Sequence, residues 1–106
     1  MTKVRITQGI CGFVTIVEAV SADGEEVVLT VNSGCESVRK MFEALGNTFD
    51  SYELCLNKPG CGPLYEYAAD NFPAHCGCLA IPGVIKAAEA ECRLALPCDA
   101  SIVFEP

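Results

Sequence analysis

The chain has 106 residues, of which 51% are hydrophobic and 20% charged, and this size and composition predict one folded domain rather than a disordered segment. Its 14 acidic residues outnumber its 7 basic ones, and a formal net charge of −7 argues against nucleic acid as a partner because phosphates would be repelled. No apolar run approaches the roughly 20 residues that span a bilayer, and no secretion signal opens the sequence, so we expect a cytoplasmic protein without membrane contact.

Three runs of β-type residues occupy the first third of the chain, at residues 3–8, 13–20 and 26–31. The first run alternates apolar and polar side chains with the period of a half-buried strand. A glycine-flanked loop separates it from the second run, and Asp23-Gly24, which tolerates the positive φ angles of tight turns, separates the second from the third. We therefore expect an antiparallel three-stranded sheet, with Cys11 near the tip of its first hairpin.

The middle of the chain has helical spacing. One apolar helix face passes through Val38, Met41, Phe42 and Leu45, and Gly46 closes this helix. Residues 47–63 are irregular and predict only one short helix. Residues 64–72 predict another short helix, which ends at Pro73.

The last third of the chain predicts a longer helix followed by a strand. The apolar stripe of the helix consists of Ile81, Ile85, Ala88, Cys92 and Leu96, with Pro82 in its first turn and Pro97 as its stop. Residues 100–105 alternate again and predict a last strand. The fold class expected for residues 1–106 is a single α+β domain, with a mainly antiparallel sheet of three N-terminal strands plus one C-terminal strand and helices packed on one face.

Cysteine is the strongest chemical signal in the sequence. Eight are present, Cys11, Cys35, Cys55, Cys61, Cys76, Cys78, Cys92 and Cys98. In a secreted domain an even number would predict a disulfide framework. Without a secretion signal the same pattern favours metal or thiol chemistry in a reducing compartment.

Four of these cysteines fall in three segments that could meet at one end of the sheet. Cys11 lies in the first hairpin, Cys35 precedes a helix, and Cys76 and Cys78 stand just upstream of another helix, where the helix dipole stabilises a thiolate. Four soft sulfur ligands suit an iron–sulfur cluster or, as the alternative, zinc. We therefore hypothesise that these four cysteines bind a metal.

Further residues could complete such a site. His75 is the only histidine and a spare ligand, Cys55 and Cys61 flank a turn-forming stretch, and Lys86 would lie near the site. The Cys76-Gly77-Cys78 spacing matches neither the Cys-x2-Cys of zinc ribbons nor a ferredoxin run. The spacing alone therefore does not identify the metal.

Two other hypotheses stay open. In the first, the protein is a thiol/disulfide redox protein that cycles Cys76 and Cys78. In the second, it is a structural or partner-binding domain with packing cysteines, as the apolar position of Cys92 on its helix already predicts for that residue. His75 beside a cysteine also suits a nucleophile. Because no orienting carboxylate or oxyanion site accompanies it, the question of catalysis stays open.

Several short motifs in this chain form a recognisable set, namely Ile10-Cys11-Gly12-Phe13, Ser33-Gly34-Cys35, Cys78-Leu79-Ala80-Ile81-Pro82, Lys86-Ala87 and Leu94-Ala95-Leu96-Pro97. With them the chain resembles a small, uncharacterised, cysteine-containing domain family of anaerobic bacteria and methanogens, a domain of unknown function. The resemblance implies that Cys11, Cys35 and one cysteine before the Pro82 helix belong to a shared set. An anaerobic setting also implies cluster chemistry.

The leading hypothesis from the sequence is thus a small cytoplasmic metal- or iron–sulfur-binding protein. Its role would be electron transfer, sensing or metal handling. Its expected partner is an unknown protein or redox partner, or a second copy of the chain in a homodimer.

Overall fold

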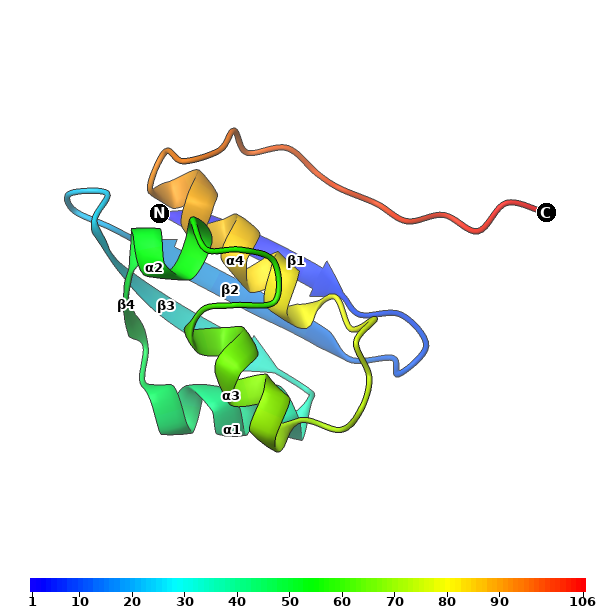
Figure 1. Ribbon diagram of the computed structural model, residues 1–106. Helices are drawn as coiled ribbons and strands as arrows, with labels where there is room; N and C mark the ends of the chain where they lie inside the picture. Colours follow the sequence, from blue (N-terminus) through cyan, green and yellow to red (C-terminus); the bar gives the residue numbers. More distant parts are fainter.

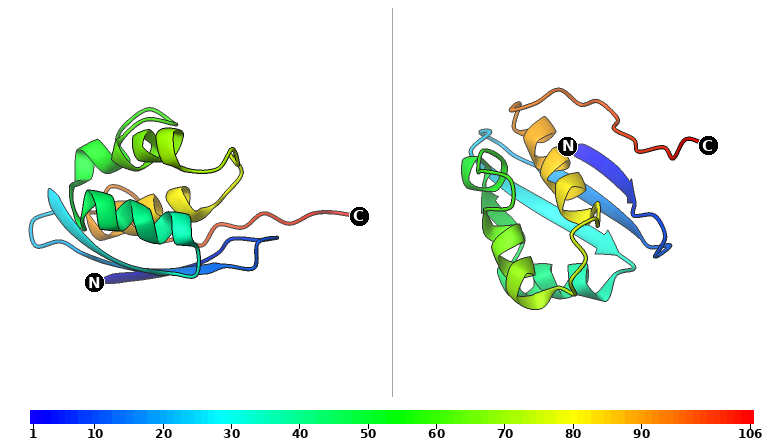
Figure 2. Two further views of the ribbon diagram at one scale, coloured as in Figure 1. Left: turned by 90° about the horizontal axis from the view of Figure 1, so that it is seen from below. Right: turned by 45° about the vertical axis from the view of Figure 1, so that its right-hand side comes forward.

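A computed structural model describes all residues, 1–106, and its centre is one antiparallel sheet. The strands lie side by side in chain order as β1 (Thr2–Thr7), β2 (Val14–Val20), β3 (Glu26–Ser33) and β4 (Thr48–Asp50). The helices are α1 (Glu36–Leu45), α2 (Ser51–Cys55), α3 (Pro63–Asn71) and α4 (Ala80–Glu91). All of them lie on the same face of the sheet (Figures 1 and 2). The α+β class and the one-sided helix layer expected from the sequence are confirmed.

The alternation of side chains sets the strand register. Val4 pairs with Val17, and Val17 pairs with Val31, so one row of apolar side chains faces the helices. The turn between β2 and β3 forms where Asp23-Gly24 predicts it. Gly24 adopts φ 79°, and the Asp23 carboxylate accepts two backbone N–H hydrogen bonds from the residues that follow.

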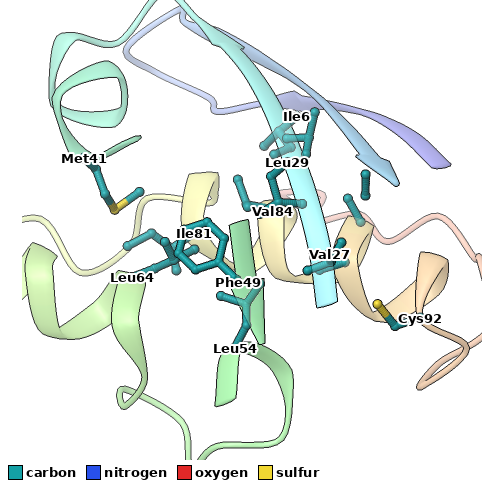
Figure 3. Packing of buried hydrophobic residues seen from close by; sticks show 14 residues of the cluster. Ile6, Val27, Leu29, Met41, Phe49, Leu54, Leu64, Ile81, Val84 and Cys92 are labelled. Carbon is teal, nitrogen blue, oxygen red and sulfur yellow. The ribbon is translucent and has the colours of Figure 1, made fainter. Parts of the chain in front are cut away.

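The hydrophobic core lies between the helices and the sheet, as Figure 3 shows. Its largest fully buried apolar side chains are Val17, Val27, Leu29, Val38, Met41, Leu64 and Val84. Cys92 is also buried, with 6% of its surface exposed, and belongs to this cluster. The packing position expected for Cys92 is therefore confirmed.

The contact between α4 and β1 depends on one glycine. A Cβ atom at Gly83 would lie 2.5 Å from both Cδ1 and Cγ1 of Ile6, which is closer than real carbon atoms approach. Because Gly83 has no side chain, the first turns of α4 can pack directly on Ile6. At the other end of α4, Glu91 accepts hydrogen bonds from the Thr2 hydroxyl at 2.7 Å and from the Ser21 N–H at 3.1 Å.

Two predicted elements differ from the structure. The fourth strand is β4, and residues 100–105 form no strand and are all exposed. In Figure 1 the C-terminal segment extends away from the sheet. A strand is stabilised by hydrogen bonds to a neighbour and by burial, and alternation alone supplies neither.

The second difference concerns the end of the last helix. The stripe predicted to continue to Leu96 stops early, because α4 ends at Glu91 and Arg93 adopts φ 61°. Leu96 is 87% exposed. The helix thus ends well before Pro97, with Arg93 in a left-handed backbone conformation just after it.

None of the helices is both long and apolar enough to cross a lipid bilayer.

Candidate functional site

Three segments meet at one end of the sheet, and we call this region the three-loop end. It consists of the β1–β2 hairpin loop at residues 8–13, the β3–α1 connection at residues 34–35, and the segment before α4 at residues 73–79. The strand register fixes the first two, because Thr7 pairs with Val14 and Thr15 pairs with Ser33. A hydrogen bond from Gln8 Nε2 to Cys78 Sγ, at 3.9 Å, attaches the third. In Figure 1 all three lie at the end of the sheet toward which β1 points.

Cys11 occupies the exposed hairpin loop. The loop is closed by the Gln8 N–H on the Phe13 carbonyl oxygen at 3.1 Å, and by the Gly12 N–H on the Gly9 carbonyl oxygen at 2.9 Å. Gly9 and Gly12 adopt φ 103° and 76°, which side-chain-bearing residues rarely do. These two glycines shape the loop that exposes Cys11 to solvent.

Cys35 is the N-cap residue of α1, and its side chain is half-buried. Its N–H donates to Ser33 Oγ at 3.1 Å, and its carbonyl oxygen accepts the Arg39 N–H at 3.1 Å. No side chain caps the first turn, so its backbone N–H groups stay without a side-chain partner, and the positive end of the helix dipole lies at Cys35. The neighbouring Gly34 packs against Phe13, whose ring would lie 3.0 Å from a Cβ atom there, so this connection contacts the hairpin.

Cys78 is half-buried next to the start of α4, while Cys76 and His75 are exposed in the same segment. Of the three, only Cys78 contacts another segment of the three-loop end through a side-chain hydrogen bond. The structure thus brings Cys11, Cys35 and Cys78 to one end of the sheet. All eight cysteines are free thiols, and no three His, Cys, Asp or Glu side chains form a group that could hold a metal ion.

Cys55 and Cys61 belong to a different region. Both border a small groove of about 270 Å³ beside α4, together with Lys86 and Glu89. Burial raises the pKa of the Cys55 thiol to about 12, with smaller contributions from the Glu89 carboxylate and from Cys92. A thiol that keeps its proton is a poor metal ligand, because the ligand is the thiolate. Lys86, which we expected near the site, pairs instead with Glu89 at 3.9 Å.

A larger groove, of about 800 Å³, borders the three-loop end at Leu79 and extends away from it along α4. It is bounded by β1, α4 and the C-terminal segment, and the cysteine that borders it is Cys98. Cys98 is exposed there.

A buried polar chain that was not predicted from the sequence lies beneath the three-loop end. Gln8 Oε1 accepts a hydrogen bond from the Thr15 hydroxyl, and Thr15 Oγ1 lies 2.7 Å from Ser33 Oγ. Gln8 is 8% exposed and Thr15 is fully buried, and Ser51 is the one other buried polar side chain. The alternation of side chains along the strands indicates this burial. Gln8, Thr15 and Ser33 fall at positions that face the helices, where apolar side chains are expected.

A family model matches residues 2–104, so the chain belongs to the family of unknown function DUF6951. The resemblance to an uncharacterised domain family, seen in the sequence motifs, is thereby confirmed. Comparisons with curated proteins and with solved structures gave no match.

Proposed function

Because membership of this family assigns no activity, we propose a function from the geometry: the protein binds a metal ion or an iron–sulfur cluster at the three-loop end. The thiolates of Cys11, Cys35 and Cys78 are the proposed ligands, with Cys76 as the fourth. The observation that carries the proposal is the meeting of three cysteine-bearing segments, distant in sequence, at one end of the sheet.

The chemistry of the donors supports soft metals. Sulfur ligands suit iron–sulfur clusters and zinc, whereas magnesium and calcium prefer oxygen. Cys35 at the N-terminus of α1 is placed where the helix dipole favours a thiolate. Cys11 and Cys76 are exposed on loops, and metal binding would require these loops to bring their thiols to Cys35 and Cys78. A site at an exposed end of the domain suits electron transfer, sensing or metal handling with a partner protein.

The test is metal analysis and a visible spectrum of protein purified without oxygen. We expect stoichiometric iron or zinc, and absorbance in the visible range if the metal is a cluster. Replacing Cys11, Cys35 or Cys78 with serine should reduce the metal content at least several-fold, because each change removes a ligand.

Cys61→Ser and Cys98→Ser are the matched controls, since both thiols are exposed and lie outside the three-loop end. They should keep the metal. Folded protein without metal after anaerobic purification would contradict the proposal. If Cys76 and Cys78 of that metal-free protein then formed a disulfide reversibly, the thiol redox hypothesis would replace it.

A further inference from the structure

An open sheet edge and an unpaired strand-like segment occur in the same chain. β1 ends the sheet, so the backbone N–H and C=O groups on its outer side have no strand partner. The other edge is β4, which has three residues and is followed at once by α2. Residues 97–106, which we call the tail, are exposed throughout and form no strand. In Figures 1 and 2 the tail projects beyond the folded domain.

The tail carries large apolar side chains that nothing covers. Ile102, Val103 and Phe104 are 70%, 71% and 96% exposed, and such β-branched and aromatic residues favour strands. Alternate residues of a strand point to opposite faces, so Ile102 and Phe104 would share one face. Asp99, Val103 and Glu105 would share the other. When it is extended beside a strand, the tail therefore has an apolar face and an acidic face.

The open edge of β1 has two faces that match those of the tail. Val4 is half-buried on the face toward the helices, where it and Pro82 border the groove of about 800 Å³. Lys3 and Arg5 are exposed on the opposite face. Lys3 pairs with Glu18 of β2 at 3.9 Å, whereas Arg5 forms no ion pair. A strand added to this edge would therefore bury its apolar face over the groove and place its acidic face beside Arg5.

The tail does not pair with β1 of its own copy. The hydrogen bond from Thr2 to Glu91 places the end of α4 beside the start of β1. From there residues 96–102 border the groove without joining the sheet. Residues 103–106 continue past it, as Figure 1 shows. The apolar side chains of Val103 and Phe104 thus point away from their own domain and are free to meet a neighbouring molecule.

We propose that the tail of a second copy docks on the open edge of β1 as an added strand, so that two copies exchange tails in a symmetric dimer. Pairing supplies the hydrogen bonds and the burial that the tail lacks within one chain. Charge selects this occupant, because Lys3 and Arg5 attract the acidic tail and repel the β1 strand of another copy. None of the proposed metal ligands borders this groove, so the inference goes beyond the proposed function and does not rest on it.

The test is the oligomeric state of full-length protein, measured by sedimentation velocity over a range of concentrations. The protein is purified without oxygen and kept with a reductant, so that no disulfide joins two copies. We expect a monomer–dimer equilibrium. A chain that ends after Leu96, and the double variant Ile102→Ser with Phe104→Ser, should be monomeric at concentrations where the unaltered protein is mainly dimeric. Cys98→Ser is the matched control, because it alters an exposed tail residue outside both faces and should dimerise normally.

Charge exchange tests which two surfaces meet. Lys3→Glu with Arg5→Glu should raise the Kd of the dimer at least about tenfold, because it sets like charges against the tail. Asp99→Lys with Glu105→Lys should weaken the dimer in the same way. When the two double variants are mixed, they should form a heterodimer, since each tail then meets an edge of opposite charge. Both variants keep a net negative charge, so general attraction between them would not produce this result.

Lys40→Glu with Lys58→Glu is the control for net charge. It makes the same charge change as the β1 variant, at exposed positions on α1 and in the α2–α3 connection that do not border the groove. It should weaken the dimer far less than the β1 variant does.

Three results would overturn the proposal. The first is full-length protein that stays monomeric up to about 1 mM. The second is a dimer that persists without the tail, and the third is the lack of a heterodimer in the mixture. If monomeric protein lost stability on truncation at every dilution, the tail would pair with its own β1 instead. We expect truncation to leave the free energy of unfolding unchanged in dilute protein, where the dimer has dissociated.

Discussion

Gly83 allows the first turns of α4 to approach Ile6 of β1 closely. Replacing it with alanine improves intrinsic helix propensity by about 1 kcal/mol. The new methyl group would, however, lie 2.5 Å from Cδ1 and Cγ1 of buried Ile6. Overpacking of this kind typically costs about 1–3 kcal/mol, so we expect Gly83→Ala to lower the free energy of unfolding by roughly 1 kcal/mol in denaturant titrations.

The same contact predicts coupling between the two positions. The double variant Gly83→Ala with Ile6→Ala should lose less stability than the sum of the single variants, because the new methyl group enters the space that Ile6 leaves. Gly77→Ala serves as the control, since the nearest atom to its new Cβ would be His75 Nε2 at 3.8 Å. If the stability losses of the two single variants add exactly in the double variant, the side chains at positions 6 and 83 do not clash sterically.

Single residues also show how far the sequence predicts the site. Glycine-flanked Cys11, helix-starting Cys35 and the Cys76–Cys78 segment could each be assigned to a loop from local patterns, and the structure places them there. Alternation indicates that Gln8, Thr15 and Ser33 face the helices, but it does not predict the hydrogen bonds between them, because Gln8 follows β1 whereas Thr15 and Ser33 lie in β2 and β3, and only the strand register brings them together. Hydrogen bonds across strands are a property of pairing, which local patterns do not encode.

At the scale of elements, Glu91 connects the end of α4 to the sheet through two hydrogen bonds. Its carboxylate accepts from the Thr2 hydroxyl of β1 and from the Ser21 N–H after β2. The hydrogen bond from Thr2, followed by the one from Ser21, lowers the pKa of Glu91 from its ordinary value of 4.5, against an opposing effect of burial. These bonds therefore stabilise the folded state more strongly while the carboxylate is ionised than when it is protonated.

We expect Glu91→Gln to be less stable than the unaltered protein at about pH 7, by up to about 1 kcal/mol for a charged group near solvent. The folded pKa is lower than the unfolded one, so this stabilisation is complete above pH 4.5 and is lost as the pH falls through the folded pKa. Denaturant titrations at several pH values should show the two proteins converging at low pH. Glu89→Gln, which alters the partly exposed pair with Lys86 and leaves the Thr2 and Ser21 hydrogen bonds intact, should have a smaller effect at about pH 7.

At the scale of the whole molecule, the C-terminal segment contributes little to the fold. Residues 96–106 are exposed throughout, with Phe104 at 96%. A chain that ends after Leu96 should keep its free energy of unfolding within about 0.5 kcal/mol, as exposed positions usually do. Cys92→Ser is the contrasting variant, because it places a hydroxyl in the core and should destabilise the protein clearly.

A large loss of stability on truncation would mean that residues 100–105 do pair with the sheet, as their alternation predicts. The structure instead gives the fourth strand to Thr48–Asp50, which pairs with β3. That strand was missed because three residues are too few for a periodic pattern. The fold class followed from the long periodic segments, whereas the choice of the fourth strand depended on contacts distant in sequence.

The outer edge of β1 is left without a strand partner, since β1 ends the sheet. An open edge with free backbone groups is a template on which further chains can stack into fibrils. β1 carries Lys3 and Arg5 on its exposed positions, two of the 7 basic residues in an otherwise acidic protein. Lys3 pairs with Glu18 at 3.9 Å, and charged side chains on an edge strand typically disfavour edge-to-edge pairing of two copies.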